Sequence, residues 1–479
     1  MRGPVLLSLL ATGACALVGV PPTESDAGPI PPPAAAPSEP AQAPGAPPPP
    51  VAGEPVPGPA PRPEPAPAPD APPPPRVVDL SAGGFPERAR VAAPTPPPAP
   101  AFGEVRALWV VRTTLTSPEA VRTMVERARR AGFNTLLVQV RGRGDAFYAS
   151  TLEPRAEQLA RQPVSFDPLA LVLEEAHAAG LAVHAWINTH LVWGGGTPPR
   201  DPGHLARTRP EALAVPRTLA RELARLHPED PRYLGALLRH AVQNSDRVEG
   251  VYTSPSHPVV QERLAQVVHE LAERYSLDGI HMDYVRYASS EFDFSGATLD
   301  AFRAWALPRV SRARARELDR AALLDPLAWP AALAGPWDEF RRESVTRGVA
   351  LVAAEARAAR PGLLVSAAVF ADREDAYRHR FQDWVSWTRE GLLDVVVPMA
   401  YTPDDGLFRS QVEVAVEWVG AGRVWAGIGA WQSTPAGTVS KIGLARELGA
   451  RGFSLFSYDW LAEQRWLGGP LLERVLEGR

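Results

Sequence analysis

The chain has 479 residues, of which 45% are apolar and 22% charged, and its formal net charge is -4 at pH 7. This near balance provides no excess of cations for a phosphate backbone, so we expect no nucleic-acid partner. The single cysteine excludes an internal disulfide and any metal site built from several cysteines.

The first 15 residues have the pattern of a bacterial export signal. A positive residue, Arg2, precedes an apolar run over 5–11 that is too short to span a bilayer. Small residues then precede Cys15, as in lipoprotein signals, where the cysteine is lipidated and becomes the mature N-terminus. Thr12 stands where leucine is usual, so an ordinary signal peptide with an incidental cysteine is the alternative. We predict an exported cell-envelope protein, anchored in a membrane through Cys15 and facing the periplasm or the exterior.

Proline and alanine dominate residues 16–102. Of the 54 prolines in the chain, 31 lie within 21–100, where they favour polyproline II and leave too few apolar side chains for a core. We predict a disordered linker, which at about 3.1 Å per residue extends to on the order of 250 Å. It would act as a spacer between a membrane and a folded domain. A neutral low-complexity insertion is the alternative.

Residues 103–479 alternate between short β-rich runs and amphipathic stretches. The expected strands are apolar on both faces, as in a covered parallel sheet, and they are 104–112, 134–141, 182–188, 279–287, 363–370, 394–401, 423–430 and 452–459. The expected helices are 118–131, 169–179, 259–275, 340–359, 383–390, 411–419, 438–448 and 462–476. These eight units predict an α/β fold, the (β/α)8 TIM barrel.

Two long insertions interrupt the predicted barrel, at 189–252 after the third strand and at 288–337 after the fourth. Both leave from strand C-terminal ends, the face on which barrel active sites lie. A doubly wound sheet is the alternative. It usually carries phosphate-binding glycines after the first strand, whereas here the first strand runs into 112–116 without a glycine.

The fourth strand contains the strongest catalytic candidate. Because side chains alternate along a strand, His281 and Asp283 share one face. A carboxylate deep in an apolar run needs either a partner or a chemical role. We predict that Asp283 is catalytic and that His281 contributes to substrate binding. The alternative is a buried structural ion pair between Asp283 and Arg286.

The second catalytic carboxylate has two candidates, Asp145 and Asp372. Asp145 follows the second strand in a glycine-containing loop, next to Arg141, which we expect to bind substrate. Asp372 follows the fifth strand. Both also have structural interpretations, because an aspartate after glycine often caps a turn and an acid at a helix start complements the helix dipole.

Aromatic and amide side chains recur where the strands end. The third strand places Trp186 and Asn188 on one face, which suits a sugar because an indole stacks on a pyranose and an amide binds hydroxyl groups. A tryptophan of the core is the alternative. Later strands add further candidates for a carbohydrate-binding rim, namely Tyr401, Trp431, Tyr458 and Asp459.

Metal chemistry is the competing interpretation of the polar residues. Possible ligands are His184, His190, His281 and Asp283, but their spacing matches no zinc motif. No Gly-x-Ser-x-Gly elbow or Walker loop is present in the sequence. We therefore predict neither a metal nor another cofactor.

Four segments together resemble the glycosyl-hydrolase-like 10 (GHL10) family over roughly 104–466. They are Glu104-Val105-Arg106-Ala107-Leu108-Trp109, the run 138–150 with Glu153-Pro154, the run 175–188, and the run 278–287. The resemblance implies an exported or lipid-anchored bacterial (β/α)8 barrel that hydrolyses glycans, including peptidoglycan strands stripped of their stem peptides. It supports Asp283 but no particular partner. This chain departs from the family pattern at Ala288, where proline is usual, and in the turn Thr189-His190.

The residues and the resemblance predict a glycoside hydrolase of the cell envelope. One carboxylate, kept protonated, would protonate the leaving oxygen, while the other attacks the sugar carbon or activates water. The expected partners are the glycan and, through the lipid, a membrane. The alternatives are a non-catalytic glycan-binding barrel that acts as an envelope scaffold and a metal-dependent glycan deacetylase.

Overall fold

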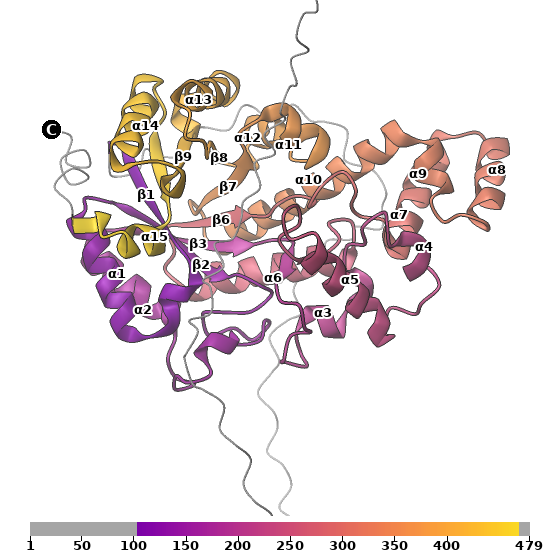
Figure 1. The fold of residues 1–479 in the computed structure, drawn as a ribbon, viewed down its shortest axis with the longest axis horizontal. Helices are drawn as coiled ribbons and strands as arrows, with labels where there is room; N and C mark the ends of the chain where they lie inside the picture. The colour runs from indigo at the N-terminus through magenta and orange to yellow at the C-terminus, as the bar shows by residue number, and fades with distance from the viewer. Residues whose placement is uncertain (1–102, 469–479) are drawn as a thin grey trace, which may run out of the picture. The chain divides into compact units, whose positions relative to one another are not determined.

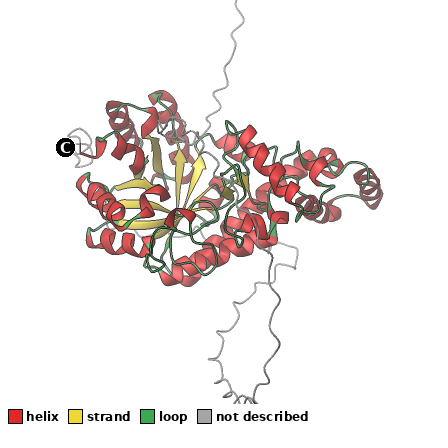
Figure 2. Cartoon of the chain, turned by 60° about the horizontal axis from the view of Figure 1, so that its bottom comes forward, coloured by secondary structure: helices red, strands yellow, loops and turns green. Residues whose placement is uncertain are grey.

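The barrel closes as predicted. A computed structural model describes residues 103–468, so the predicted signal, Cys15, the linker 16–102 and the residues after 468 lie outside the described part. Eight parallel strands form a closed barrel in the order β1-β10-β9-β8-β7-β6-β3-β2 (Figures 1 and 2). They are β1 (Val105–Val110), β2 (Thr135–Arg141), β3 (Ala182–Asn188), β6 (Gly279–Asp283), β7 (Leu364–Phe370), β8 (Val395–Met399), β9 (Trp425–Gly429) and β10 (Gly452–Phe456).

Helices follow the strands and cover the barrel (Figure 2). They are α1 (Pro118–Arg130), α2 (Pro168–Ala178), α6 (Pro258–Arg274), α10 (Ala334–Ala359), α11 (Arg373–His379), α12 (Trp384–Arg389), α13 (Asp405–Val419), α14 (Pro435–Glu447) and α15 (Tyr458–Glu463). The predicted last helix, 462–476, is misplaced, because α15 begins directly after β10; the end of that stretch lies outside the described residues. No helix in 103–468 has the length and apolar character needed to cross a bilayer.

The first helix shows how local sequence defines an element. Pro118 occupies its first turn, and the Ser117 hydroxyl accepts a hydrogen bond from the Ala120 backbone N–H at 3.2 Å. Gly132 follows the helix with φ at 81°, a conformation that favours glycine. The helix buries the predicted stripe, which consists of Val121, Met124, Val125 and Ala128.

The two predicted insertions are present and share an apolar cluster. The first contains β4 (Leu191–Trp193), α3 (Leu205–Thr208), α4 (Ala220–Leu223), α5 (Pro231–Gln243) and β5 (Val251–Tyr252). The second contains α7 (Gly296–Ala306), α8 (Arg312–Ala322) and α9 (Ala328–Ala332). Side chains such as Leu237, Phe302 and Trp337 join them in one core beside the barrel. Figure 1 shows α4 and α7–α9 on the right, away from β1 and α14.

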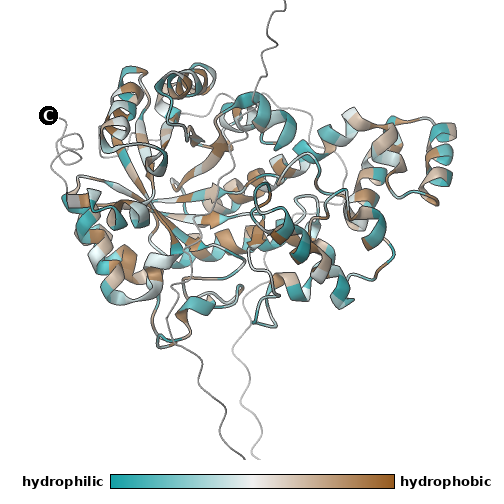
Figure 3. Ribbon diagram, viewed as in Figure 1, coloured by the Kyte–Doolittle hydropathy of each residue, from teal (hydrophilic) through white to brown (hydrophobic). Residues whose placement is uncertain are grey.

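The barrel interior is filled rather than open. The Trp109 ring meets the Trp186 ring at 4.6 Å and the His281 ring at 4.7 Å between centroids, both nearly perpendicular. Trp425 and Val397 belong to the same interior cluster. Figure 3 shows hydrophobic residues both on the strands and on the helices around them. A substrate must therefore bind above this packed core, at the strand ends.

Candidate active site

The C-terminal ends of the strands carry a ring of half-buried apolar side chains. It is contributed by six strands or the turns that follow them, and its members are Val111, Tyr284, Phe370, Met399, Tyr401, Trp431 and Phe456. Within the ring, Tyr401 and Trp431 lie 4.9 Å apart between ring centroids, and Trp431 lies 5.4 Å from Phe456. The predicted rim residues Tyr401 and Trp431 therefore do come together, in an aromatic cluster of the kind on which sugar faces pack.

Asp283 ends β6 and is nearly fully buried at this rim. Its carboxylate accepts a hydrogen bond from the Tyr284 backbone N–H at 2.7 Å. Burial raises the pKa of Asp283 to about 6, and the charge of Glu249 adds to the rise. The Tyr284 N–H, the Arg286 charge and a hydrogen bond from Trp186 act in the opposite direction. Asp283 thus retains a proton closer to neutral pH than an exposed aspartate does.

Glu249 is the functional candidate that the sequence did not reveal. It lies in the first insertion, between α5 and β5, and it pairs with Arg286 at 2.7 Å. The Tyr252 hydroxyl donates to its second oxygen at 2.6 Å. Burial alone would raise the pKa of Glu249, but Arg286 and Tyr252 outweigh that effect and leave the pKa lowered. Arg286 therefore pairs with Glu249. The alternative interpretation of Asp283 required an ion pair between Arg286 and Asp283, and that pair is not formed.

The pKa values of the two carboxyl groups are shifted in opposite directions. That of Asp283 is raised to about 6, whereas that of Glu249 is lowered. Pairs of titratable groups whose pKa values are driven apart are typical of acid and base catalysis. No sequence motif could indicate Glu249, because only the folding of the insertion brings it to β6.

Asp145 lies in the loop after β2 and is buried. One of its oxygens accepts a hydrogen bond from the Arg143 backbone N–H at 2.9 Å, which is the turn-capping contact anticipated as an alternative. Its charge also acts on the Arg112 guanidinium at the end of β1. Asp145 is therefore both a turn residue and a carboxylate beside a cation at the barrel mouth.

Arg141 is not available to substrate, which corrects its predicted role. The residue is 1% exposed, and its guanidinium forms an ion pair with Glu153 at 3.1 Å. It also donates to the backbone carbonyl of Asn188. Because these contacts satisfy the buried charge, Arg141 stabilises the β2–β3 connection.

Asp372 is corrected for a similar reason. Its side chain is exposed and caps α11 by accepting from the Asp375 backbone N–H at 2.9 Å. This is the helix-start interpretation that the sequence left open. The structure gives Asp372 no contact with the other candidate carboxylates.

Tyr458 and Asp459, at the start of α15, are held by contacts with α1 and with the segment between β1 and α1. The Tyr458 hydroxyl hydrogen-bonds Arg127 of α1, on the outer side of the barrel wall. The Asp459 carboxylate accepts from Val111 N–H at 3.1 Å and from the hydroxyls of Thr113 and Thr114. Both residues therefore fix α15 against β1 and α1, and neither is free for a sugar.

Trp186 and Asn188 share a face, as predicted, but they form the floor of the site. The Trp186 indole donates to the Asn188 side-chain oxygen at 2.9 Å, and the Asn188 amide donates to the Gly142 carbonyl at 2.8 Å. Trp186 is only 3% exposed, so its ring has no free face for a pyranose. The alternative of a core tryptophan is correct.

His281 lies deeper still. It is completely buried, one ring nitrogen contacts the Ser366 hydroxyl at 2.8 Å, and burial holds its pKa well below the usual value. His281 therefore cannot touch a substrate at the rim. Within 103–468 no three His, Cys, Asp or Glu side chains gather as a metal site would require, so the proposed ligands His184, His190, His281 and Asp283 are not assembled.

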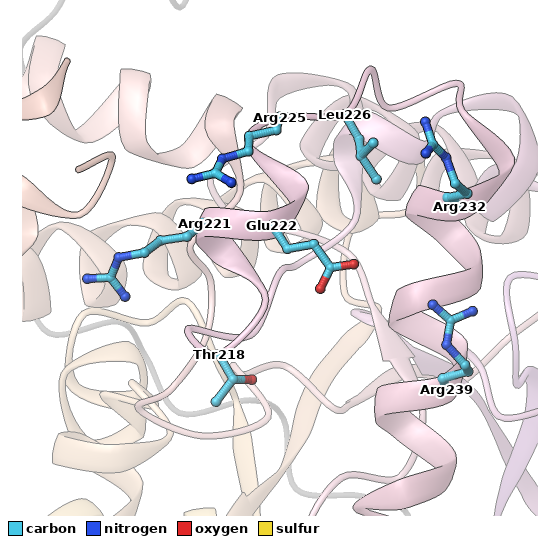
Figure 4. A pocket seen from close by; sticks show the side chains of 7 residues that line it. All are labelled: Thr218, Arg221, Glu222, Arg225, Leu226, Arg232 and Arg239. Carbon is cyan, nitrogen blue, oxygen red and sulfur yellow. The ribbon is translucent and has the colours of Figure 1, made fainter. Parts of the chain in front are cut away.

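A groove of about 570 Å³ lies elsewhere, between α4 and α5 of the first insertion (Figure 4). It is lined by Thr218, Arg221, Glu222, Arg225, Leu226, Arg232 and Arg239. Arg221 pairs with Asp325 at 2.9 Å and Arg232 with Asp230 at 2.6 Å. The groove offers one carboxylate and no aromatic ring, so it does not match the acid and base chemistry expected at the barrel mouth.

Comparison with known proteins agrees with the fold. The model of the family described as glycosyl hydrolase-like 10 matches residues 104–428. This chain belongs to that family. Glycosyl hydrolase DigH of Escherichia coli (strain K12) is 24% identical over 306 residues, covering 60% of this chain and 58% of DigH. Glycosyl hydrolase YngK of Bacillus subtilis (strain 168) is 22% identical over 318 residues, covering 62% of this chain and 51% of YngK.

The matched part of this chain thus spans less than two thirds of the length of either relative. Among solved structures, β-galactosidase from the psychrophilic Marinomonas ef1 matches with a TM-score of 0.50 and 15% identity, over 74% of this chain and 54% of that one. The catalytic domain of β-amylase from Paenibacillus polymyxa also has a TM-score of 0.50, with 11% identity over 74% and 93% of the two chains. These structures share the barrel fold. Membership of the family supports a function of the glycoside hydrolase type.

Proposed function

We propose that this protein is an exported, lipid-anchored glycoside hydrolase that cleaves peptidoglycan glycan strands or a related envelope polysaccharide. The observation that carries the proposal is Asp283, a carboxyl group at the barrel rim whose pKa burial raises to about 6. Such a group can hold a proton for a leaving oxygen near neutral pH. The aromatic cluster of Tyr401, Trp431 and Phe456 supplies an apolar surface for sugar rings.

In the proposed reaction, Asp283 donates its proton to the glycosidic oxygen as the bond between that oxygen and the sugar carbon breaks. Asp145 takes the second role, either by attacking the carbon or by accepting a proton from the attacking water. Glu249 is less suited to that role, because Arg286 and Tyr252 occupy both of its oxygens. Its negative charge instead adds to the rise in the pKa of Asp283 that burial mainly causes. A carboxyl separation of about 5 Å would give retention and one of about 6.5–9.5 Å inversion.

The test uses purified full-length protein with intact sacculi and with glycan strands stripped of their stem peptides, followed by mass spectrometry of soluble products. Short muro-oligosaccharides released from the stripped strands would support the proposal. Strands that bind the protein but are never shortened would favour the non-catalytic scaffold.

Asp283→Asn should lower turnover at least about a thousandfold, because the proton donor is lost while shape and polarity are kept. The fold control is urea unfolding at pH 7. A carboxyl group whose folded pKa is raised gives up stability as pH rises through that pKa, so the variant should be up to about 3 kcal/mol more stable than the parent at pH 7. Asp145→Asn should be equally inactive. Full turnover by Asp283→Asn would overturn the assignment.

A further inference from the structure

Arg112 is a buried cation with an incomplete set of partners. It is 8% exposed, and one terminal nitrogen donates to the Gln139 side-chain oxygen at 2.8 Å, whereas its Nε has no hydrogen-bond partner in the described residues. Gly142 leaves room for it, because a Cβ there would lie 2.6 Å from Arg112 Cδ. A buried polar group of this kind normally binds water or a ligand.

A second guanidinium lies close to the first. Arg143 is half-buried in the loop after β2, where Gly194 faces its guanidinium, and within 103–468 its side chain forms no hydrogen bond or ion pair. Burial and then the charge of Arg143 lower the pKa of Arg112 to about 10, so Arg112 remains cationic at neutral pH. Two like charges in a partly buried site repel each other unless an anion lies between them.

The carboxylates nearby do not satisfy these cations. Asp145 and Asp459 both act on Arg112 electrostatically, but neither forms an ion pair with it or with Arg143. One oxygen of Asp145 is occupied by the Arg143 backbone, and Asp459 binds the β1–α1 connection. The hydrogen-bonding capacity of the two guanidiniums is therefore largely unused.

The arginine pair belongs to the same rim as Asp283. Gln139 accepts from Arg112 and donates to Asn188 at 3.4 Å, and Asn188 lies opposite Asp283 in the β3–β6 register. Tyr284, the residue after Asp283, also acts on the charge of Arg112. A sugar positioned over Asp283 thus has the arginine pair within the same site.

We propose that Arg112 and Arg143 form a subsite for a carboxylate carried on the substrate sugar. Guanidinium groups bind carboxylates through paired, charge-assisted hydrogen bonds, which a neutral hydroxyl cannot replace. The inference rests on the proposed function and narrows its substrate to glycans with free sugar carboxylates, such as a lactyl ether whose carboxyl group carries no peptide.

The experiment compares two preparations of peptide-stripped glycan strands, one with free carboxylates and one with the carboxylates amidated by ethanolamine to remove their charge. Full-length wild type, Arg143→Gln and Arg225→Gln are assayed on both for kcat and KM, and for Kd by sedimentation. We choose Arg143 for substitution because its side chain forms no hydrogen bond or ion pair with another residue within 103–468. Arg225, an exposed arginine of the distant groove, is the matched control.

We expect wild type and Arg225→Gln to show a KM at least tenfold lower for the acidic strands than for the amidated ones. Arg143→Gln should raise KM about tenfold on acidic strands only, with kcat unchanged. Equal KM for both preparations in wild type, or equal losses on both in Arg143→Gln, would overturn the subsite.

Failure of the proposed function gives a different result. If wild type cleaves neither preparation, the proposed hydrolase function is wrong. The Kd values alone then test whether the two arginines bind a carboxylate. A tenfold weaker Kd of Arg143→Gln for acidic strands, with no change for amidated strands, would support the carboxylate subsite in a binding protein. No difference in Kd between the two preparations would overturn it.

Discussion

A carboxyl group with a pKa near 6 is useful for catalysis when a neighbouring group stays ionised through the same pH range. Asp283 and Glu249 meet this condition because one is buried with few compensating contacts and the other is paired with Arg286 and Tyr252. The negative charge of Glu249 also disfavours a second negative charge on Asp283. Glu249 is therefore a positioning residue that acts through the protonation state of Asp283.

This relation predicts a pH dependence. Since the acid form of Asp283 is the active one, kcat should fall as pH rises through about 6. Glu249→Gln removes a charge that raises the pKa of Asp283, so the falling limb should move to lower pH. Each unit of movement lowers the rate at pH 7 about tenfold.

The measurement is kcat against pH on stripped glycan strands for wild type and Glu249→Gln, with Glu229→Gln as the control, since Glu229 is exposed in a distant loop. The control should keep the wild-type profile. If part of the Glu249→Gln protein were unfolded, kcat would be lower by the same factor at every pH, and the pH at which kcat falls would not change. A limb that stays in place or moves to higher pH would contradict the role of Glu249.

At the level of single residues, sequence reasoning proposed Asp283 and did not propose Glu249, for a physical reason. Asp283 stands out because it interrupts an apolar strand, which is a local signal. Glu249 lies among polar residues of an insertion, and its proximity to Arg286 depends on how 37 residues fold back. Trp186 and Arg141 had the right position along their strands, but alternation alone cannot distinguish a rim side chain from one buried beneath it.

At the level of elements, the strands were predictable because a covered parallel sheet is apolar on both faces. The expected strand 279–287 nevertheless stops at Asp283. Tyr284 has φ at 50°, in the left-handed region, and so the chain turns there. The strand ends where the candidate site begins, and apolar residues after the turn, such as Val285, conceal that boundary in the sequence.

The link between β2 and the loop after it provides a stability prediction. Arg141 and Glu153 are each 2% exposed in their side chains, so Arg141→Met leaves a buried carboxylate without its partner. The expected loss is about 3–5 kcal/mol in the free energy of unfolding, and Arg141→Met combined with Glu153→Leu should recover much of it.

Urea unfolding of these variants checks the prediction. The exposed pair Arg122–Glu175 is the matched control, and Arg122→Met should change stability by less than about 1 kcal/mol. A loss in Arg141→Met no larger than in the control would show that Arg141 is not the structural residue described, and its expected contact with substrate would have to be reconsidered.

At the level of the whole molecule, the proposed site combines parts that are distant in the sequence. The barrel supplies Asp283 and the aromatic cluster, the first insertion supplies Glu249, and the loop after β2 supplies Arg143. The barrel and its insertions follow from periodicity and length. The contacts among these parts depend on packing across the rim, and a single sequence carries no signal for them.

The N-terminal region leads to the last prediction, which concerns where this barrel works. If Cys15 carries lipid and residues 16–102 act as a spacer, the full chain should fractionate with membranes, and Cys15→Ser should be released in soluble form. Specific activity on soluble strands should be the same for both, because a spacer of this length, if extended, would give about 250 Å of reach between anchor and barrel. Fractionation with incorporation of a labelled fatty acid measures this. A Cys15→Ser protein that still sediments with membranes would mean that something other than a lipid on Cys15 holds the chain there.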